Sequence, residues 1–322
     1  MAHGHHGHSH GHGHAHGHDH GKALHDSGGG YGRLFAIGIV LNLGFVIIEA
    51  WFGWKTGSLA LLADAAHNLG DVGGLVLAWA AWAAARLPAS EHKTYGWQRG
   101  SILASFINAV VLLVAMGSLG WEAVGRLQDP SPVAAGTVMV VAAVGVVINA
   151  ATALLFMRGS DRDLNIRGAF LHMAADALVS LGVIIAGALY LWQGWAWIDP
   201  LASLAIALVV IIGTWSLFRQ SLHLLFDGVP EHIDLQAVRA TLNALPGVTA
   251  VHDLHVWAMS TAEPALTAHL VCREDTVVGS VLREARQQLH QHYAIDHVTL
   301  QVEHEACASH CDAGTAAPHI HP

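Results

Sequence analysis

Two histidine–aspartate pairs with the same spacing stand in the most apolar part of this chain. His67 precedes Asp71 by four residues, and His172 precedes Asp176 by four residues. Residues four apart lie on one face of an α-helix. Two imidazole nitrogens and two carboxylates from two facing helices supply four ligands, the tetrahedral number that Zn²⁺ favours. The spacing therefore predicts a metal site between two helices.

An ionised side chain without a partner has a high free-energy cost in the apolar segments that contain these pairs. A charged side chain in the middle of a bilayer costs about 2.5–3.5 kcal/mol on insertion scales. Glu49 and Asp64 also stand in apolar segments. The alternative to a metal site is that each histidine and carboxylate only hydrogen-bonds inside a helix bundle. For Asp64, three residues before His67, support of a metal ligand and a plain helix–helix hydrogen bond both stay open.

The composition is that of a membrane protein. Of the 322 residues, 53% are hydrophobic and 12% are charged, whereas a soluble domain is about 25% charged. Six apolar segments are each long enough to cross about 30 Å of hydrocarbon as a helix. They cover residues 34–54, 59–84, 102–124, 133–157, 169–192 and 197–217. We therefore expect an all-α bundle of six transmembrane helices over residues 31–226, in contact with the lipid bilayer.

The flanking lysines and arginines predict the orientation of this bundle. With the N-terminus inside, nine of them lie on the inner side, and Lys55 and Arg126 lie on the outer side. Both termini are then cytoplasmic. In this orientation Asp71 and Asp176 lie about 12 Å and about 10 Å from the inner face, so that the two pairs meet at one depth.

Residues 227–305 have the composition of a soluble domain. Helical spacing over 233–245 and 277–293 alternates with strand patterns over 248–259, 265–272 and 297–303. This α-β-β-α-β order predicts a small α+β domain of the ferredoxin or metallochaperone type. Because its core is minimal, packing against a partner is expected.

Both ends of the chain are rich in metal-ligand side chains. Eleven of the 26 histidines lie within the first 25 residues, interspersed with Gly. This pattern predicts a disordered, metal-gathering tail over residues 1–30 rather than an uninterrupted purification tag. The second tail, 306–322, carries Cys307, His310 and Cys311. Thiolates with imidazole suit Zn²⁺ or Cu⁺, and the alternative is a reduced tail without metal.

Four motifs in order resemble the cation diffusion facilitator family, and within it the bacterial zinc, cobalt and cadmium exporter branch. They are Leu62–Asp71, His172–Asp176, the Asp199-Pro200 pair and His252–Trp257. The resemblance covers about residues 31–305. It implies a six-helix membrane domain, a cytoplasmic metallochaperone-like domain and a homodimer in the bacterial inner membrane. It also implies export of divalent metal in exchange for protons.

The resemblance also assigns residues by position. His67, Asp71, His172 and Asp176 become the transport site, and the histidine-containing version of that site is associated with zinc. In the soluble domain His252 and His269 match family ligands. The last strand offers Gln301 and Glu303 where some members have His and Asp, so that a cytoplasmic metal site is expected in altered form. The alternative is that these histidines are only solvated.

The predicted function is export of divalent cations, chiefly Zn²⁺, by metal/proton antiport. Ligands that must lose protons before they bind metal couple the two ions, and the same ligand types accept Co²⁺, Cd²⁺ and Ni²⁺. The chain has neither an ATP-binding Gly-x4-Gly-Lys-Ser/Thr loop nor a His-Glu-x2-His protease motif. A net charge of −9 argues against nucleic acid as a partner. We expect no enzyme activity and no cofactor, and the alternative function is a membrane-anchored zinc sensor or buffer.

Overall fold

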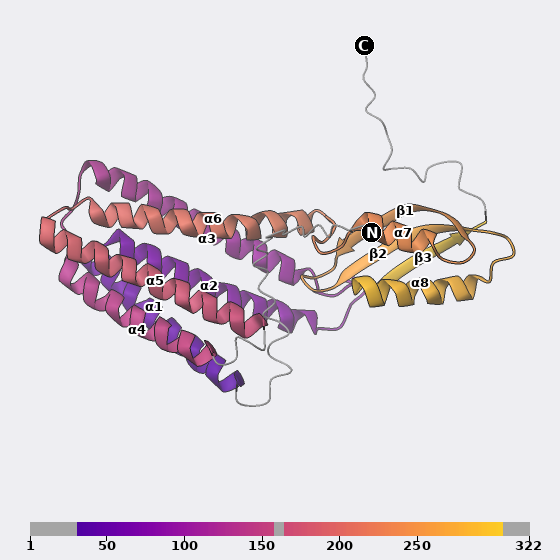
Figure 1. Cartoon of the computed structure of the whole chain (residues 1–322), viewed down its shortest axis with the longest axis horizontal. Coiled ribbons are helices and arrows are strands. Elements are labelled where there is room, and N and C mark those ends of the chain that lie inside the picture. Colours follow the sequence, from indigo (N-terminus) through magenta and orange to yellow (C-terminus); the bar gives the residue numbers. More distant parts are fainter. Residues whose placement is uncertain (1–30, 158–163, 305–322) are drawn as a thin grey trace, which may run out of the picture.

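The computed structural model describes residues 31–157 and 164–304. Six long helices come first, and a small α+β unit follows them along the long axis of the molecule (Figure 1). The helices are α1 (Tyr31–Thr56), α2 (Leu59–Ala85), α3 (Gly100–Gln128), α4 (Ala135–Met157), α5 (Leu164–Gln193) and α6 (Ile198–Leu225). Helix α6 continues past the predicted end at residue 217, because a helix can leave an apolar environment without ending.

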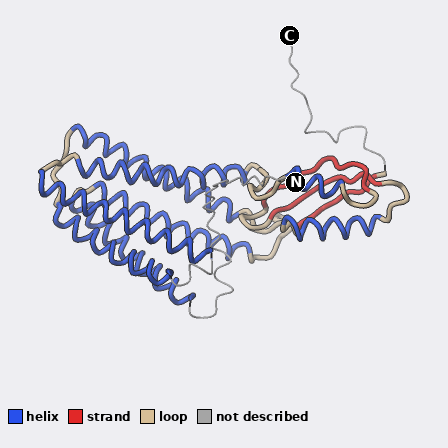
Figure 2. The backbone as a smooth tube through the Cα atoms, viewed as in Figure 1, coloured by secondary structure: helices blue, strands red, loops and turns tan. Residues whose placement is uncertain are grey.

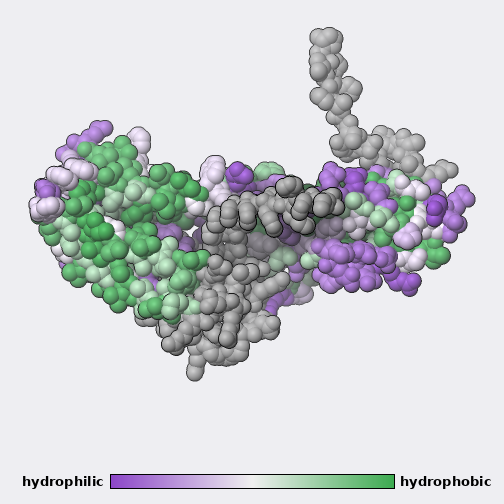
Figure 3. All heavy atoms as spheres, in the orientation of Figure 1, coloured by the Kyte–Doolittle hydropathy of each residue, from purple (hydrophilic) through white to green (hydrophobic). Residues whose placement is uncertain are grey.

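The surface of the helical region is apolar. Among the described residues, α3, α4, α5 and α6 contain stretches long and apolar enough to cross a membrane by length and composition. Large side chains such as Leu178 and Ile212 are exposed on their outer faces. Figure 3 shows hydrophobic residues over this region and mostly hydrophilic residues over the C-terminal unit. The two parts therefore suit different solvents.

Polar contacts fix the end of the bundle where α2 and α6 begin. Ser58 is the N-cap residue of α2, and its hydroxyl donates to Asp199 Oδ1 at 2.5 Å. The backbone N–H of Leu59 donates to Asp199 Oδ2 at 2.8 Å. Gly57 has a φ of +70°, and its carbonyl accepts from Arg126 of α3 at 2.5 Å. These bonds set the position of α2 along the bundle axis.

Small residues let the helices approach closely near the middle of the bundle. A Cβ atom on Gly145 of α4 would lie 2.6 Å from Phe45 Cζ of α1 and 3.2 Å from Ser180 Oγ of α5. Phe45 and Ser180 are both buried. The absence of a side chain at position 145 therefore allows α1, α4 and α5 to meet at one level.

The C-terminal unit is a three-stranded sheet with two helices. Its elements are α7 (Leu235–Asn243), β1 (Val248–Ala258), β2 (Pro264–Cys272), α8 (Val278–Tyr293) and β3 (His297–Glu303). Figure 2 shows that the strands are confined to this unit. The strand order is β1-β2-β3, with β1 antiparallel and β3 parallel to β2. The side chains of Val238, Leu242, Leu266, Leu270 and Leu289 form its buried core.

The loop between α2 and α3 joins the two parts of the molecule. Arg99 forms an ion pair with Asp227, directly after α6. The hydroxyl of Ser101 accepts from the backbone N–H of Thr261 at 3.1 Å. These contacts link the start of α3 to both the end of α6 and the turn between β1 and β2.

Candidate metal centres

Helices α2 and α5 bring the four predicted side chains of the bundle together. His67 Nε2 lies 3.7 Å from Asp71 Oδ2 and 3.5 Å from Asp176 Oδ1. His172 Nε2 lies 3.2 Å from Asp71 Oδ2 and 3.6 Å from Asp176 Oδ2. Each histidine thus lies near the aspartate of its own helix and the aspartate of the other helix.

These distances fit the dimensions of a tetrahedral zinc site. With zinc–ligand bonds of about 2.1 Å, two neighbouring ligand atoms of a tetrahedron lie about 3.4 Å apart. The four nitrogen–oxygen distances are 3.2–3.7 Å and lie on both sides of this value, with Asp176 facing His67 through Oδ1 and His172 through Oδ2. One ligand atom each from Asp71, His172 and Asp176 lies within 4.8 Å of the other two. The cluster can accept a dication with small side-chain adjustments.

The four side chains differ in their access to solvent. Asp176 is 1% exposed, whereas the side chains of Asp71 and His172 each retain 30% exposure. His67 is intermediate at 19%. The cluster is therefore closed on the Asp176 side and open beside Asp71 and His172, a geometry through which an ion can enter and leave.

A second polar cluster lies next to the first and is fully buried. It consists of Glu49 of α1, Asp64 and Asn68 of α2, and Ser180 of α5. Asp64 accepts a hydrogen bond from Ser180 Oγ at 3.0 Å, which is a helix–helix contact of the kind left open by the sequence. Sequence reasoning missed Asn68 and Ser180. Their positions, four residues after Asp64 and after Asp176, are the signal that could have found them.

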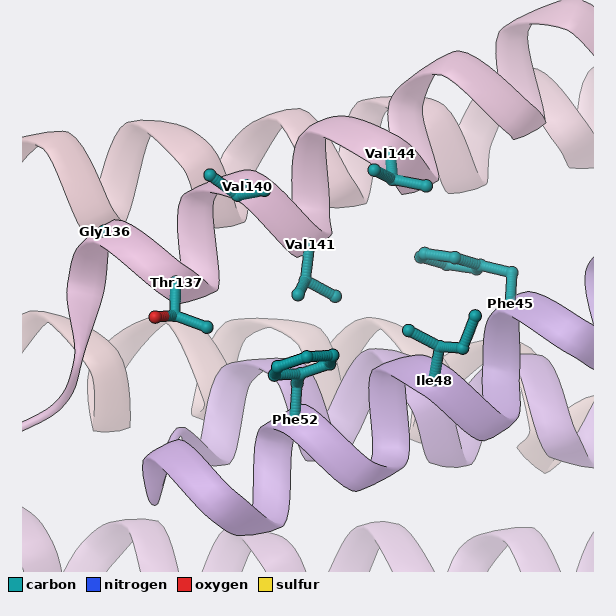
Figure 4. A pocket seen from close by; sticks show the side chains of 8 residues that line it. All are labelled: Phe45, Ile48, Phe52, Gly136, Thr137, Val140, Val141 and Val144. Atoms are coloured by element: carbon teal, nitrogen blue, oxygen red, sulfur yellow. The ribbon is translucent and has the colours of Figure 1, made fainter.

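An apolar groove between α1 and α4 has a different character. Its volume is about 460 Å³. In Figure 4, Phe45, Ile48 and Phe52 of α1 lie opposite Val141 and Val144 of α4 across this groove. The hydroxyl of Thr137 is its one polar side-chain group among the lining residues. The groove therefore offers no ligand to a charged ion.

The C-terminal unit brings its three predicted ligands together as well. His252 of β1 and His269 of β2 are cross-strand partners. His252 Nε2 lies 3.0 Å from Glu303 Oε2, and His269 Nδ1 lies 2.9 Å from Glu303 Oε1. Glu303 stands on β3, which is parallel to β2. All three side chains are partly buried, and one ligand atom of each lies within 4.8 Å of the others.

Asp253 joins this second group because of a backbone irregularity. It stands beside His252 on a strand, where neighbouring side chains normally point to opposite faces. Its φ of +48° and a register shift between His252 and His255 change that alternation. Its Oδ2 atom lies 3.6 Å from His269 Nε2, and its Oδ1 atom lies 2.9 Å from His255 Nε2. Strict strand alternation could not have predicted this placement.

Hydrogen bonds favour the charged form of both carboxylates at this sheet site. The hydrogen bond with His255, followed by neighbouring imidazoles, lowers the pKa of Asp253. For Glu303, desolvation raises the pKa, but hydrogen bonds from His252 and Gln301 outweigh it, and the pKa is lowered. Both groups are therefore carboxylates at neutral pH, the form that binds metal.

The remaining predicted ligands, Cys307, His310 and Cys311, lie outside the described residues, as does the histidine-rich segment 1–30. They stay predictions from the sequence.

Comparison with known families identifies the chain. Residues 35–226 match the model of the cation efflux transmembrane domain, and residues 230–305 match that of the cation efflux protein cytoplasmic domain. The chain belongs to the cation efflux family. This confirms the family predicted from the motifs. Membership makes the chain a membrane protein and a cation transporter, not an enzyme.

Several curated relatives are similar over most of this cation efflux protein. The cadmium, cobalt and zinc/H(+)-K(+) antiporter of Bacillus subtilis is 37% identical over 85% of this chain and 89% of its own length. The metal cation efflux system protein CzcD of Cupriavidus metallidurans is 38% identical, over 92% of this chain and 93% of its own. The zinc transporter ZitB of Escherichia coli is 36% identical, over 85% and 87%. A solved metal-bound C-terminal domain of CzcD is 39% identical, covering 22% of this chain and 99% of its own, with a TM-score of 0.22.

Proposed function

We propose that this cation efflux protein exports divalent metal, chiefly Zn²⁺, from the cytoplasm in exchange for protons. The observation that carries the proposal is the group of four nitrogen–oxygen distances of 3.2–3.7 Å between α2 and α5. Asp71, His172 and Asp176 each offer a ligand atom within 4.8 Å of the others, and His67 lies next to both aspartates, so the two helices supply zinc ligands within an apolar bundle. His67, Asp71, His172 and Asp176 are the transport site in this proposal.

Charge balance explains how one site serves both ions. Asp71 and Asp176 together bring two negative charges into an apolar bundle, where ionised groups are costly. A dication neutralises them, and so do protons. Because the ligands must be deprotonated to bind metal, metal and protons compete for the same atoms. Each pH unit of gradient contributes about 1.36 kcal/mol for each proton that is exchanged.

The proposed topology has six membrane-spanning helices. Helices α1 and α2 contain 26 and 27 residues, so each is about 40 Å long and sufficient to cross the bilayer beside the other four. We assign residues 31–226 to the transmembrane domain and 227–305 to the cytoplasmic domain, with tails at 1–30 and 306–322. Both termini lie in the cytoplasm of a bacterial inner-membrane homodimer. The relatives named as transporters of bacteria support this placement.

The sheet cluster is a second metal site in this proposal, with a regulatory or structural role. His252, His269 and Glu303 supply two nitrogens and a carboxylate within 4.8 Å of one another. This donor set suits Zn²⁺. Since the cluster lies in the cytoplasmic domain, it senses the metal concentration on the side from which cargo is taken.

A flux measurement in sealed proteoliposomes tests the transport proposal. Asp176→Asn keeps the size of the side chain and removes its charge, and zinc flux driven by a pH gradient is expected to fall at least about 100-fold, since even loss of an outer partner costs 10–100-fold in metal affinity or activity. Glu122→Gln, an exposed acid-to-amide change on α3, is the matched control and should keep wild-type flux. Wild-type flux in Asp176→Asn would reject the site. Zinc binding without any flux in the wild-type protein would favour the sensor.

A further inference from the structure

The second buried cluster has no role in the four-ligand site and needs its own explanation. Glu49, Asp64, Asn68 and Ser180 are each 0% exposed. Asp64 precedes His67 by three residues on α2, and Ser180 follows Asp176 by four residues on α5. On both helices the step from the transport site is in the same direction, and Asp64 and Ser180 lie about one helical turn, about 5 Å, from the nearest ligand of their helix. In the proposed orientation this is the outer side.

The contacts within the cluster connect two carboxyl groups. Asn68 Nδ2 lies 3.4 Å from Glu49 Oε2 and 3.5 Å from Asp64 Oδ1. Ser180 Oγ donates to Asp64 Oδ2 at 3.0 Å. The amide of Asn68 thus lies between the carboxyl groups of Glu49 and Asp64 and contacts both. Two ionised carboxylates that share one amide in a buried site would repel each other, and a proton on one of them removes that repulsion.

The balance of donors and acceptors leads to the same conclusion. The Asn68 amide offers two N–H donors and the Ser180 hydroxyl offers one O–H. They face four carboxyl oxygens and Asn68 Oδ1, which are all acceptors. Within the described part of the chain, Glu49 Oε1 and Asn68 Oδ1 are buried without a hydrogen-bond partner. Burial of unsatisfied polar atoms is costly, and an additional proton supplies the donor that this cluster lacks.

The charged groups around the cluster do not replace that proton. Helix α4, which packs on α1, contains no acidic, basic or histidine residue. On α2 and α5, the ionisable groups near the Glu49–Asp64 pair are the four side chains of the transport site. The ionisable residues of α3 and α6 stand toward the ends of these helices: Glu122, Arg126, Asp199, Arg219 and His223. No lysine or arginine stands in the middle of any of the six helix sequences.

We propose that Glu49 and Asp64 are a proton-holding pair that couples proton entry to metal release. This inference rests on the proposed antiport function and names one place where the exchanged proton is kept. With the transport site empty, the pair binds one proton from the outer side. When a dication enters the transport site one turn away, its positive charge favours the doubly ionised pair, and the proton is released toward the inner side. The proton that enters and the proton that leaves are balanced over one cycle.

The donor set favours a proton over a second transition-metal ion. The cluster contains carboxyl, amide and hydroxyl groups but no imidazole or thiolate, which are the ligands that favour zinc. A second metal bound at the cluster is therefore an alternative outcome of the test.

Infrared spectroscopy of the full-length protein tests the protonated pair directly. A protonated carboxyl group has a C=O stretch that is separate from the carboxylate bands. We expect this band in the metal-free wild type at neutral pH, and we expect zinc to abolish it. Glu49→Gln and Asp64→Asn should each remove it, because the amide replaces the protonated acid as donor. Glu122→Gln is the matched control and should keep it. Absence of the band in the wild type, or its persistence in both variants, would overturn the proposal. Extra bound metal that Glu49→Gln removes would overturn it as well.

The steady-state zinc accumulation ratio in proteoliposomes gives a second measurement. Each coupled proton raises this ratio about tenfold per pH unit of gradient. Glu49→Gln and Asp64→Asn should therefore accumulate about tenfold less zinc per pH unit than the wild type, while Glu122→Gln matches the wild type. An unchanged slope would refute the pair and leave the transport proposal intact. If the wild type moves no zinc, the transport proposal itself fails. If a variant moves no zinc at all, the infrared band alone tests whether Glu49 and Asp64 hold a proton.

Discussion

The close approach of α1, α4 and α5 at Gly145 gives a prediction whose size follows from the structure. In Gly145→Ala the new methyl carbon would lie 2.6 Å from Phe45 Cζ and 3.2 Å from Ser180 Oγ. Carbon atoms pack at about 3.5–4.0 Å, so the first contact is about 1 Å too short. Phe45 is 2% exposed and Ser180 is 0% exposed. The methyl group therefore displaces the Phe45 ring toward the apolar groove between α1 and α4, or it pushes the helices apart.

Overpacking of this kind costs about 1–3 kcal/mol. Gly182→Ala on α5 is the matched control, because its methyl group meets nothing within 4 Å. Both changes gain the same helix propensity, so their difference isolates the steric cost. For a unit of about 150–250 residues, such as the helical region, about 2–4 °C of melting temperature corresponds to 1 kcal/mol.

Thermal unfolding of the purified protein in detergent therefore serves as the assay. Gly145→Ala should melt about 2–12 °C below Gly182→Ala. It should also transport zinc more slowly, because Ser180 lies one turn from Asp176 on the helix that must shift. Equal melting temperatures for the two variants would refute the packing derived for Gly145.

Three further predictions concern other parts of the chain. Asp199→Asn loses a charge-assisted acceptor for two buried donors and should destabilise the protein by about 1.5–3 kcal/mol, measured by thermal unfolding in detergent. Burial raises the pKa of the Cys272 thiol, so less thiolate forms at neutral pH, and maleimide labelling of a variant without the tail cysteines should be slow until denaturant is added. His252→Ala should remove one bound zinc per protomer in a calorimetric titration, whereas His255→Ala, which is outside the ligand triad, should keep it.

Local sequence patterns predicted most of the elements. Apolar segments longer than 20 residues favour helices because each backbone group is satisfied within its own segment. The helices found from Tyr31 to Leu225 lie at the predicted segments. The strand and helix patterns after residue 227 also correspond to α7, α8 and the three strands. The number of helices that cross the membrane stays a prediction beyond the four that meet the length and composition criterion among the described residues.

Sequence spacing was less informative about contacts between elements. The two histidine–aspartate pairs were expected to face each other because they have equal spacing and equal depth. The structure brings these groups together. The contacts of Asn68 and Ser180 were not expected, because spacing within one helix does not show which residue on another helix a short polar side chain contacts. Asp253 was not expected as a neighbour of His269, because only a positive φ at a register shift places it there.

The sequence alone determined which side chains repeat at helical spacing, which segments are apolar and which family motifs stand in order. These features depend on residues that are close in sequence, so they can be identified from the spacing of residue types along the chain. Only the tertiary structure decided that Ser180 of α5 donates to Asp64 of α2, and that Glu49 of α1 and Asp64 share the buried amide of Asn68. Such contacts depend on close approach at glycines and on helix ends held by Ser58 and Asp199, where residues far apart in sequence act on one another.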